Sequence, residues 1–317
     1  ASINNRPFYS DDIGVTWNPA SNWNTQGGSK LFDSHVIQNE NTGINEIFFL
    51  SRETWNQAIS VQKSNVEDMD FKQERSFTTS DHRNLSMARV GNGNDVFILE
   101  QLSAGTSKIF QWDAEADNFV NINNNTQIGS GEIGRINLDV VMIEDTLRMY
   151  SYNDAQEFYK SSDLGQTWEL QSILPIDPWE VGVYIIPSDP KNLILGGVNA
   201  YRSNNGGQNW QIVNEWWEYY QNTTTKLHAD IMSFEEYTDS AGEPFLLINN
   251  HGGISMSRNY GKENVNIGLY GLNTAQYYDV RTLPSSPEWV FAGAQDQGFQ
   301  KGILQDDQQV GGFEQII

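Results

Sequence analysis

Short apolar runs separated by turn residues dominate the pattern of hydrophobic and polar positions along this chain. Stretches rich in Val, Ile, Phe, Tyr and Trp are broken about every 8 to 12 residues by Gly, Asn, Asp or Ser, which is typical of β-strands joined by tight turns. Helical periodicity is almost absent. The clearest predicted strands are residues 46–50, 95–99, 138–143, 181–186 and 245–249. The pattern therefore predicts an all-β fold.

An eight-residue motif recurs within this pattern. Residues 10–17 and 161–168 both match S-x-D-x-G-x-T-W, and residues 203–210 and 257–264 are weaker copies. The last three copies begin 42 and 54 residues apart, and the 151 residues between the first two are close to three such units. Periods of about 40 to 50 residues are typical of propellers and other arrays of small sheets.

The residue types of the motif explain why it recurs. The Asp or Asn at its third position can accept hydrogen bonds from backbone N–H groups of its own turn, Gly supplies a positive φ, and the Thr hydroxyl caps the turn. The Trp is expected to pack between neighbouring sheets. We therefore predict a structural and not a catalytic role for Ser10, Asp12, Gly14, Thr16, Trp17, Ser161, Asp163, Gly165, Thr167, Trp168, Ser203, Asn205, Gly207 and Trp210.

The repeats predict a β-propeller of about seven blades. The units fall at about 1–25, 28–75, 77–122, 127–172, 177–213, 226–266 and 272–303. We expect residues 1–303 to form the propeller and residues 304–317 to be a linker or closing strand. Because the first unit is incomplete, either the two ends share one blade or the chain is the propeller portion of a longer or processed multidomain protein.

Composition and charge narrow the classes of function. The chain has 19 Lys and Arg against 41 Asp and Glu, a net charge of −22, so nucleic acids and anionic membranes are poor partners. No apolar run approaches the about 20 residues of a membrane-spanning helix, so membrane insertion is not expected. The chain has no cysteine and no H-E-x-x-H pattern. We expect neither a metal site nor a cofactor.

The second half of the chain carries a series of short blocks in a characteristic order. They are His-Ala-Asp at 228–230, Asn-Asn-His-Gly-Gly at 249–253, a block from Gly271 to Tyr278, and Gly-Ala-Gln-Asp-Gln-Gly at 293–298. The repeated motif resembles the Asp-box, or BNR repeat. Together with these blocks it resembles a family of exported bacterial Asp-box propellers related to sortilin and to xyloglucanase-type glycoside hydrolases. The resemblance implies a secreted or cell-surface protein, although His251 and Gln297 replace the family's usual Asp and Asn.

Two aspartates of these blocks are candidate catalytic residues. A glycosidase needs two carboxylates facing a sugar, about 5 to 5.5 Å apart for retention or about 6.5 to 9.5 Å for inversion. Asp230 and Asp296 adjoin predicted inner strands, which line the channel of a propeller. The alternative is that both carboxylates fix loops by accepting backbone hydrogen bonds. Xyloglucanase-type enzymes use aspartates from two propellers, whereas this chain holds one, so a non-catalytic role is favoured.

An aromatic cluster indicates binding instead. Trp216, Trp217, Tyr219 and Tyr220 fall in a loop between two units, where their rings either stack on sugars or cover a neighbouring blade. Further candidate ligand-binding residues are His228, His251, Gln276, Tyr277 and Gln295. Our first hypothesis is an exported, non-catalytic module that binds a polysaccharide or a protein partner on the propeller face. The alternatives are a xyloglucanase-like glycoside hydrolase and a subunit of a cell-surface or secretion-associated complex.

Overall fold

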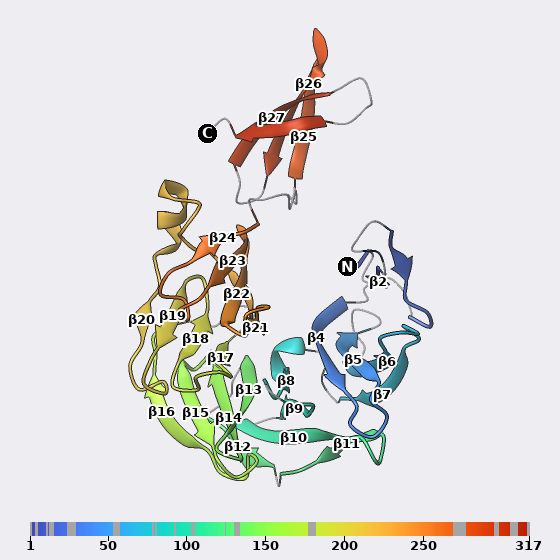
Figure 1. Ribbon diagram of the computed structural model, residues 1–317, viewed down its shortest axis with the longest axis vertical. Coiled ribbons are helices and arrows are strands. Elements are labelled where there is room, and N and C mark those ends of the chain that lie inside the picture. Colours follow the sequence, from blue (N-terminus) through green and yellow to red (C-terminus); the bar gives the residue numbers. More distant parts are fainter. Residues whose placement is uncertain are drawn as a thin grey trace. The chain divides into compact units, whose positions relative to one another are not determined.

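In the computed structural model, β-strands are the main secondary structure of the described residues (Figure 1). The described residues are 2–3, 6–10, 12, 16–23, 30–52, 58–77, 79, 81–91, 93–102, 105–123, 125–129, 134–176, 182–268, 277–294, 298–304 and 310–315. The chain divides into two compact units, Ala1–Ile212 and Val213–Ile317. Over the described ranges, no helix is both long and apolar enough to cross a membrane.

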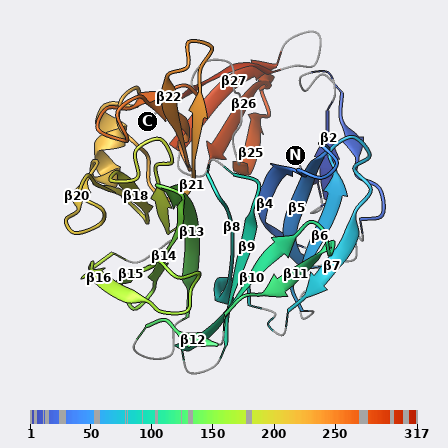
Figure 2. The same cartoon turned by 60° about the horizontal axis from the view of Figure 1, so that its bottom comes forward.

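In the first unit, the strands form antiparallel sheets in which neighbours in the sheet follow one another along the chain (Figures 1 and 2). A three-stranded sheet contains β1 (Ser2–Ile3), β2 (Arg6–Tyr9) and β3 (Asn18–Pro19). The next contains β4 (Lys30–Gln38), β5 (Asn45–Arg52), β6 (Ser60–Asn65) and β7 (Lys72–Ser76). The third sheet follows the 3-10 helix η1 (His82–Asn84) and contains β8 (Leu85–Arg89), β9 (Val96–Gln101), β10 (Thr106–Asp113) and β11 (Asn118–Asn121). A fifth strand of this sheet, β12 (Thr126–Gln127), also pairs with β10. The fourth sheet contains β13 (Ile136–Ile143), β14 (Thr146–Asn153), β15 (Glu157–Ser161) and β16 (Glu169–Ile173). The fifth contains β17 (Val183–Ile185), β18 (Leu193–Gly196), β19 (Ala200–Ser203) and β20 (Gln211–Ile212).

The second unit repeats the same topology. It begins with the 3-10 helix η3 (Trp216–Gln221) and a sheet of β21 (Ile231–Thr238), β22 (Pro244–Asn250), β23 (Gly253–Ser257) and β24 (Val265–Asn266). The last sheet contains β25 (Tyr277–Leu283), β26 (Ser286–Ala294), β27 (Gly298–Leu304) and β28 (Val310–Gln315). The prediction of an all-β fold made of small antiparallel sheets is therefore confirmed, and these four-stranded sheets are the kind of unit that forms the blades of propellers.

In the first unit, the first strands of the four sheets that begin with β4, β8, β13 and β17 lie side by side (Figure 2). The backbone N of Leu138 on β13 donates to Oγ of Ser86 on β8 over 2.8 Å. The backbone N of Ile185 on β17 donates to Oδ2 of Asp139 on β13 over 2.5 Å. Strand β4 contacts β8, and Nε2 of His35 on β4 lies 3.2 Å from the carbonyl oxygen of Met87 on β8. These four sheets are therefore joined through their first strands.

Strand β9 shows why the apolar runs of this chain are continuous rather than alternating. All six of its residues are buried. Val96 and Ile98 belong to the core cluster shared with the preceding sheet, whereas Phe97 and Leu99 belong to the cluster shared with the following one. Because successive side chains of a strand point to opposite faces, the run from Val96 to Leu99, which lies between two neighbouring sheets, is apolar at every position.

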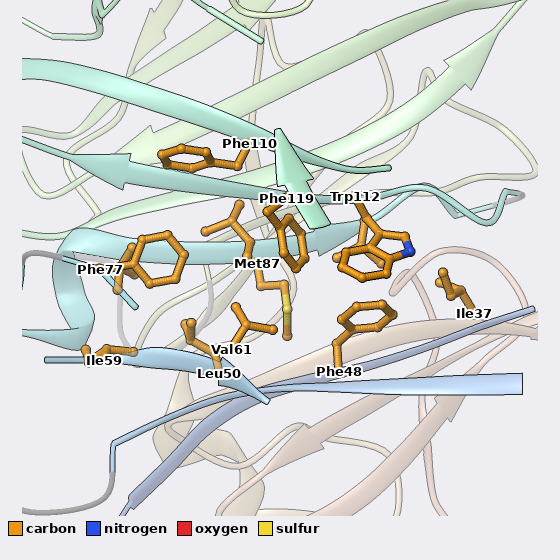
Figure 3. Close-up of a cluster of buried hydrophobic side chains, with 13 residues drawn as sticks. Ile37, Phe48, Leu50, Ile59, Val61, Phe77, Met87, Phe110, Trp112 and Phe119 are labelled. Carbon is orange, nitrogen blue, oxygen red and sulfur yellow. The ribbon is translucent and has the colours of Figure 1, made fainter. Parts of the chain in front are cut away.

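Aromatic side chains fill the space between the second and third sheets (Figure 3). The rings of Phe48 and Trp112 lie 5.0 Å apart between centroids, and those of Trp112 and Phe119 lie 5.1 Å apart, both edge to face. This is a favourable geometry for aromatic pairs. Lys63 covers the Trp112 ring at 4.4 Å from its centroid and pairs with Glu46 at 3.3 Å. The aromatic residues of the chain thus hold neighbouring sheets together.

The repeated motif at residues 161–168, which we call an Asp-box after the repeat that it resembles, forms the turn between the third and fourth strands of its sheet. Oγ of Ser161 donates to Oδ1 of Asp163 over 2.8 Å and accepts from the backbone N of Gly165 over 3.0 Å. The backbone N and the hydroxyl of Thr167 donate to the two carboxylate oxygens over 2.9 and 2.6 Å. Trp168 packs against the cluster shared with the preceding sheet. One carboxylate thus closes the whole turn.

The other copies repeat this hydrogen-bond pattern. The residue at the third position, Asp12, Asn205 or Asn259, accepts from the backbone N of the seventh residue over 2.8, 3.0 and 2.7 Å respectively. At the eighth position, Nε1 of Trp210 donates to the box glycine carbonyl over 2.9 Å, and Nδ2 of Asn264 makes the equivalent bond over 3.2 Å. The degenerate copies are therefore true structural equivalents. Among the motif residues, Gly14 lies outside the described residues, and Trp17 is half exposed.

Candidate functional site

The antiparallel topology of the sheet β21–β24 gathers several of the predicted binding residues at one end. Residues 228–230 directly precede β21, and His251 and Gly252 form the turn between β22 and β23. Ile231 pairs with Asn250 in the sheet register. The start of β21 and the turn after β22 therefore lie at the same end, and the box turn at 257–264 lies at the opposite end.

The aromatic loop forms the 3-10 helix η3, which polar contacts hold in place. Oε1 of Glu218 accepts from the backbone N of Glu215 over 3.0 Å, and its Oε2 pairs with Nζ of Lys226. The hydrogen bond from Lys226, assisted by that from Glu215, lowers the pKa of the Glu218 carboxyl. Nδ2 and Oδ1 of Asn214 bond the backbone of Leu227 over 3.0 and 2.9 Å. These contacts join both ends of the loop.

His228 is the buried centre of this region, with only 2% of its surface exposed. Its Nε2 lies 3.1 Å from the hydroxyl of Tyr220, and its Nδ1 lies 3.2 Å from the carbonyl oxygen of Ala229. Because a carbonyl can only accept, Nδ1 is the donor in that contact, and in the neutral imidazole this leaves Nε2 to accept from the Tyr220 hydroxyl. The ring of Tyr219 contacts the imidazole edge to face, with centroids 4.7 Å apart. His228 thus anchors two tyrosines of η3.

The turn after β22 packs directly on His228. A Cβ added at Gly252 would lie 2.5 Å from the Cβ of His228, so only glycine fits at this position. The backbone N of His251 donates to the carbonyl oxygen of Ala229 over 3.2 Å. The Nδ1 of His251 lies 3.1 Å from Oδ2 of Asp230. The residues predicted from two separate blocks are therefore brought together.

Asp230 shows a second unusual feature. Its backbone φ is +60°, a left-handed conformation that few residues other than glycine adopt. Oδ2 of its carboxylate lies 3.1 Å from Nδ1 of His251, and within the described residues no backbone amide donates to this carboxylate. Asp296, the proposed catalytic partner, lies outside the described residues, as do Gln276 and Gln295. For Tyr277 only the backbone is described, as the first residue of β25.

The four predicted aromatic residues separate into two roles. Trp216, Trp217 and Tyr220 are 42, 49 and 50% exposed, whereas Tyr219 is 8% exposed. Burial raises the pKa of the Tyr219 hydroxyl. The rings of Trp216 and Tyr220 stand at 90° to each other, 6.3 Å apart between centroids. We call Trp216, Trp217 and Tyr220 the aromatic surface, and Tyr219 supports it from beneath.

The sequence alone did not link these residues. The aromatic loop and the histidine block were separate predictions, since no helical or strand periodicity relates Tyr220 to His228. Their closeness along the chain is the signal that could have linked the two predictions, because Tyr220 and His228 are only eight residues apart. In the part of the chain that the structure describes, no group of three His, Asp or Glu side chains is placed to hold a metal ion.

Comparisons with known proteins give matches among solved structures only. No protein-family model matches this sequence, and no curated protein matches it. The chain is similar to the structure titled "YCF48 bound to D1 peptide", with 11% identity and a TM-score of 0.45 over 90% of this chain and 80% of that one. It is similar to the Dos1 propeller, with 11% identity and a TM-score of 0.46 over 78% of this chain and 61% of that one.

A third similar structure is that of the GH74 enzyme from Niastella koreensis, with 11% identity and a TM-score of 0.49. The similarity covers 92% of this chain and 38% of that one. This chain therefore spans less than two thirds of the Dos1 propeller and of the GH74 enzyme. All three TM-scores lie below 0.5.

Proposed function

We propose that this chain is an exported, non-catalytic binding module that recognises a neutral polysaccharide through the aromatic surface. The observation that carries this proposal is the exposure of Trp216, Trp217 and Tyr220 on a rigid base. Leaving three large apolar rings near half exposed costs solvation free energy, and a cluster of such rings at one place is typical of a binding site. Flat rings offer large contact area to the C–H faces of sugars at low conformational cost.

The base beneath the rings favours binding because it is organised in advance. Tyr220 is hydrogen-bonded to the buried His228, and the Glu218–Lys226 pair and Asn214 hold the loop. A ligand that meets a preformed surface does not have to offset the entropy of ordering it. The aromatic surface is therefore suited to a ligand that itself offers few charges.

Charge supports a neutral ligand at this surface. The chain carries a net charge of −22, so an acidic polysaccharide would be repelled at a distance. Export, as a further part of this proposal, rests on the order of the sequence blocks between residues 228 and 298. Hydrolysis is the less favoured alternative, because the carboxylate of Asp230 is paired with His251.

The chain provides a matched control for the test. Trp217 and Trp17 are both 49% exposed, but Trp17 belongs to an Asp-box turn of the other unit. Isothermal titration calorimetry against soluble xyloglucan, mixed-linkage β-glucan and galactomannan should detect binding that Trp217→Ala weakens about tenfold or more, as is usual for a central aromatic contact. Trp17→Ala should bind as the unaltered chain does. Equal loss in both variants, or no binding to any of the three glycans, would contradict the proposal.

A further inference from the structure

A cavity of about 80 Å³ lies in the first unit, near the starts of the first strands of four sheets. Its lining includes Phe32 and Asp33 of β4, Ser86 of β8, Arg135 just before β13, and Gly182 just before β17. A water molecule needs about 10 to 15 Å³ on this measure, so the cavity has room for a group of about five non-hydrogen atoms. None of the residues of the aromatic surface contributes to it.

The cavity holds a positive charge that the described residues do not neutralise. Within the described residues, the guanidinium of Arg135 has neither a carboxylate partner nor a hydrogen-bond acceptor. Acidic residues outnumber basic ones by 41 to 19 in this chain, so an arginine without a carboxylate partner is unexpected. Arginine is the side chain best suited to bind a carboxylate through two parallel hydrogen bonds.

Three carboxylates near this cavity, in the part of the chain that the structure describes, have partners of their own. Asp81 binds the guanidinium of Arg83 at 2.6 Å, and Asp154 accepts from a backbone N–H of the loop before β13 over 2.9 Å. Asp33 lines the cavity and lies 3.7 Å from Nε2 of His35. The lining residues thus carry two guanidinium groups, those of Arg83 and Arg135, against one carboxylate.

A neutral donor complements the guanidinium. Oγ of Ser86 accepts a hydrogen bond from the backbone N of Leu138 over 2.8 Å, which leaves its own O–H to donate. The lining also has an apolar part, which includes the buried Leu50, Leu85 and Ile136. A ligand with one polar end and a short hydrocarbon stem fits such a lining better than a symmetric anion does.

We propose that this cavity binds the carboxylate of a small organic acid, with the guanidinium of Arg135 and the hydroxyl of Ser86 as donors. The carboxylate lies against these two groups, and the hydrocarbon stem contacts the apolar side. This site is independent of the proposed polysaccharide binding, because it uses other residues in the other unit. It gives the chain a second ligand of a different chemical class.

Propionate and propionamide form the decisive pair of probes, because they have nearly the same shape and differ in charge. For a ligand of five non-hydrogen atoms, a dissociation constant of about 1 mM is expected. Binding is measured on the full chain by ligand-observed NMR. Propionate should bind, and propionamide should bind about tenfold more weakly or worse, since it lacks the charge-assisted hydrogen bonds.

Arg135→Gln should weaken propionate binding about tenfold or more while keeping most of the side-chain volume. Arg202→Ala is the matched control, because it removes one arginine whose guanidinium bonds Gln211 of its own sheet. The unfolding midpoints of all variants are measured in parallel, and Arg135→Gln should unfold within the range of the control. Equal affinity for the two probes, no saturable binding of propionate at about 50 mM, or unchanged binding in Arg135→Gln would overturn the proposal.

Discussion

The two adjacent glycines of the third Asp-box provide a sharp test of how the box holds its sheet. Gly206 and Gly207 have φ values of +72° and +86°, both in the left-handed region. An added Cβ at Gly206 would meet nothing within 4 Å. At Gly207 it would lie 2.2 Å from Cε1 and 2.9 Å from Cδ1 of Phe158, on the preceding sheet.

The ring of Phe158 has no room to move aside. It is fully buried, stacks on Tyr150 with centroids 5.8 Å apart, and meets Trp210 edge to face at 5.7 Å. Gly206→Ala is expected to cost only the left-handed strain of a Cβ, about 1 to 2 kcal/mol. Gly207→Ala adds the cost of overpacking a full core, about 1 to 3 kcal/mol more.

The assay is denaturant unfolding of both variants and the unaltered chain, followed by tryptophan fluorescence and circular dichroism. Gly207→Ala should unfold at a clearly lower denaturant concentration than Gly206→Ala, and Gly206→Ala slightly below the unaltered chain. The difference between the variants isolates the contact with Phe158, because the two positions share the same turn and the same sign of φ. Equal midpoints would refute the inference that the box glycine packs against the neighbouring sheet.

Further predictions concern individual side chains. Tyr220→Phe removes the donor to His228 and leaves a buried acceptor without a partner, so it should lower the free energy of unfolding by about 1 to 3 kcal/mol in denaturant titrations. Burial, with the nearby Glu157 charge and its hydrogen bond, raises the pKa of Tyr159 to about 12. The folded state therefore favours the neutral phenol. The resulting contribution to the free energy of unfolding is complete below pH 10 and is lost as the pH rises toward 12. Ultraviolet titration of the unaltered chain against Tyr159→Phe should show one tyrosine ionising near pH 12, and ionisation near pH 10 would contradict this. The hydrogen bond from Lys226 keeps the pKa of the Glu218 carboxyl below its usual value. The ionised carboxylate therefore stabilises the fold above pH 4.5, and this stabilisation is lost as the pH falls. Urea unfolding of Glu218→Gln and of the unaltered chain, compared between pH 3 and 7, should show this loss.

Local hydrogen bonding explains why the Asp-boxes could be predicted from the sequence. Ser161, Asp163 and Thr167 satisfy one another within a single turn, so their spacing alone specifies the geometry. The strands were predictable for a related reason, since β9 is apolar at both of its faces and is bounded by turn residues. Such features depend on neighbours along the chain.

The candidate sites depend on contacts that no short pattern encodes. The pairing of Asp230 with His251 follows from the register of β21 on β22, which sets Ile231 opposite Asn250. The cavity beside Arg135 is assembled from the starts of strands about 50 residues apart along the chain. Tyr219 shows the same limit, because composition could not tell the buried tyrosine from its exposed neighbour Tyr220.

The most direct test of the account is to follow the indole N–H resonances of the chain by NMR while a neutral glycan is added. Of the 10 tryptophans, Trp216 and Trp217 should show the largest shifts, and the resonance of Trp17 should stay in place. Single Trp→Phe variants assign the three signals. If the glycan moves none of the resonances, or moves that of Trp17 as far as those of Trp216 and Trp217, the aromatic surface is not the binding site.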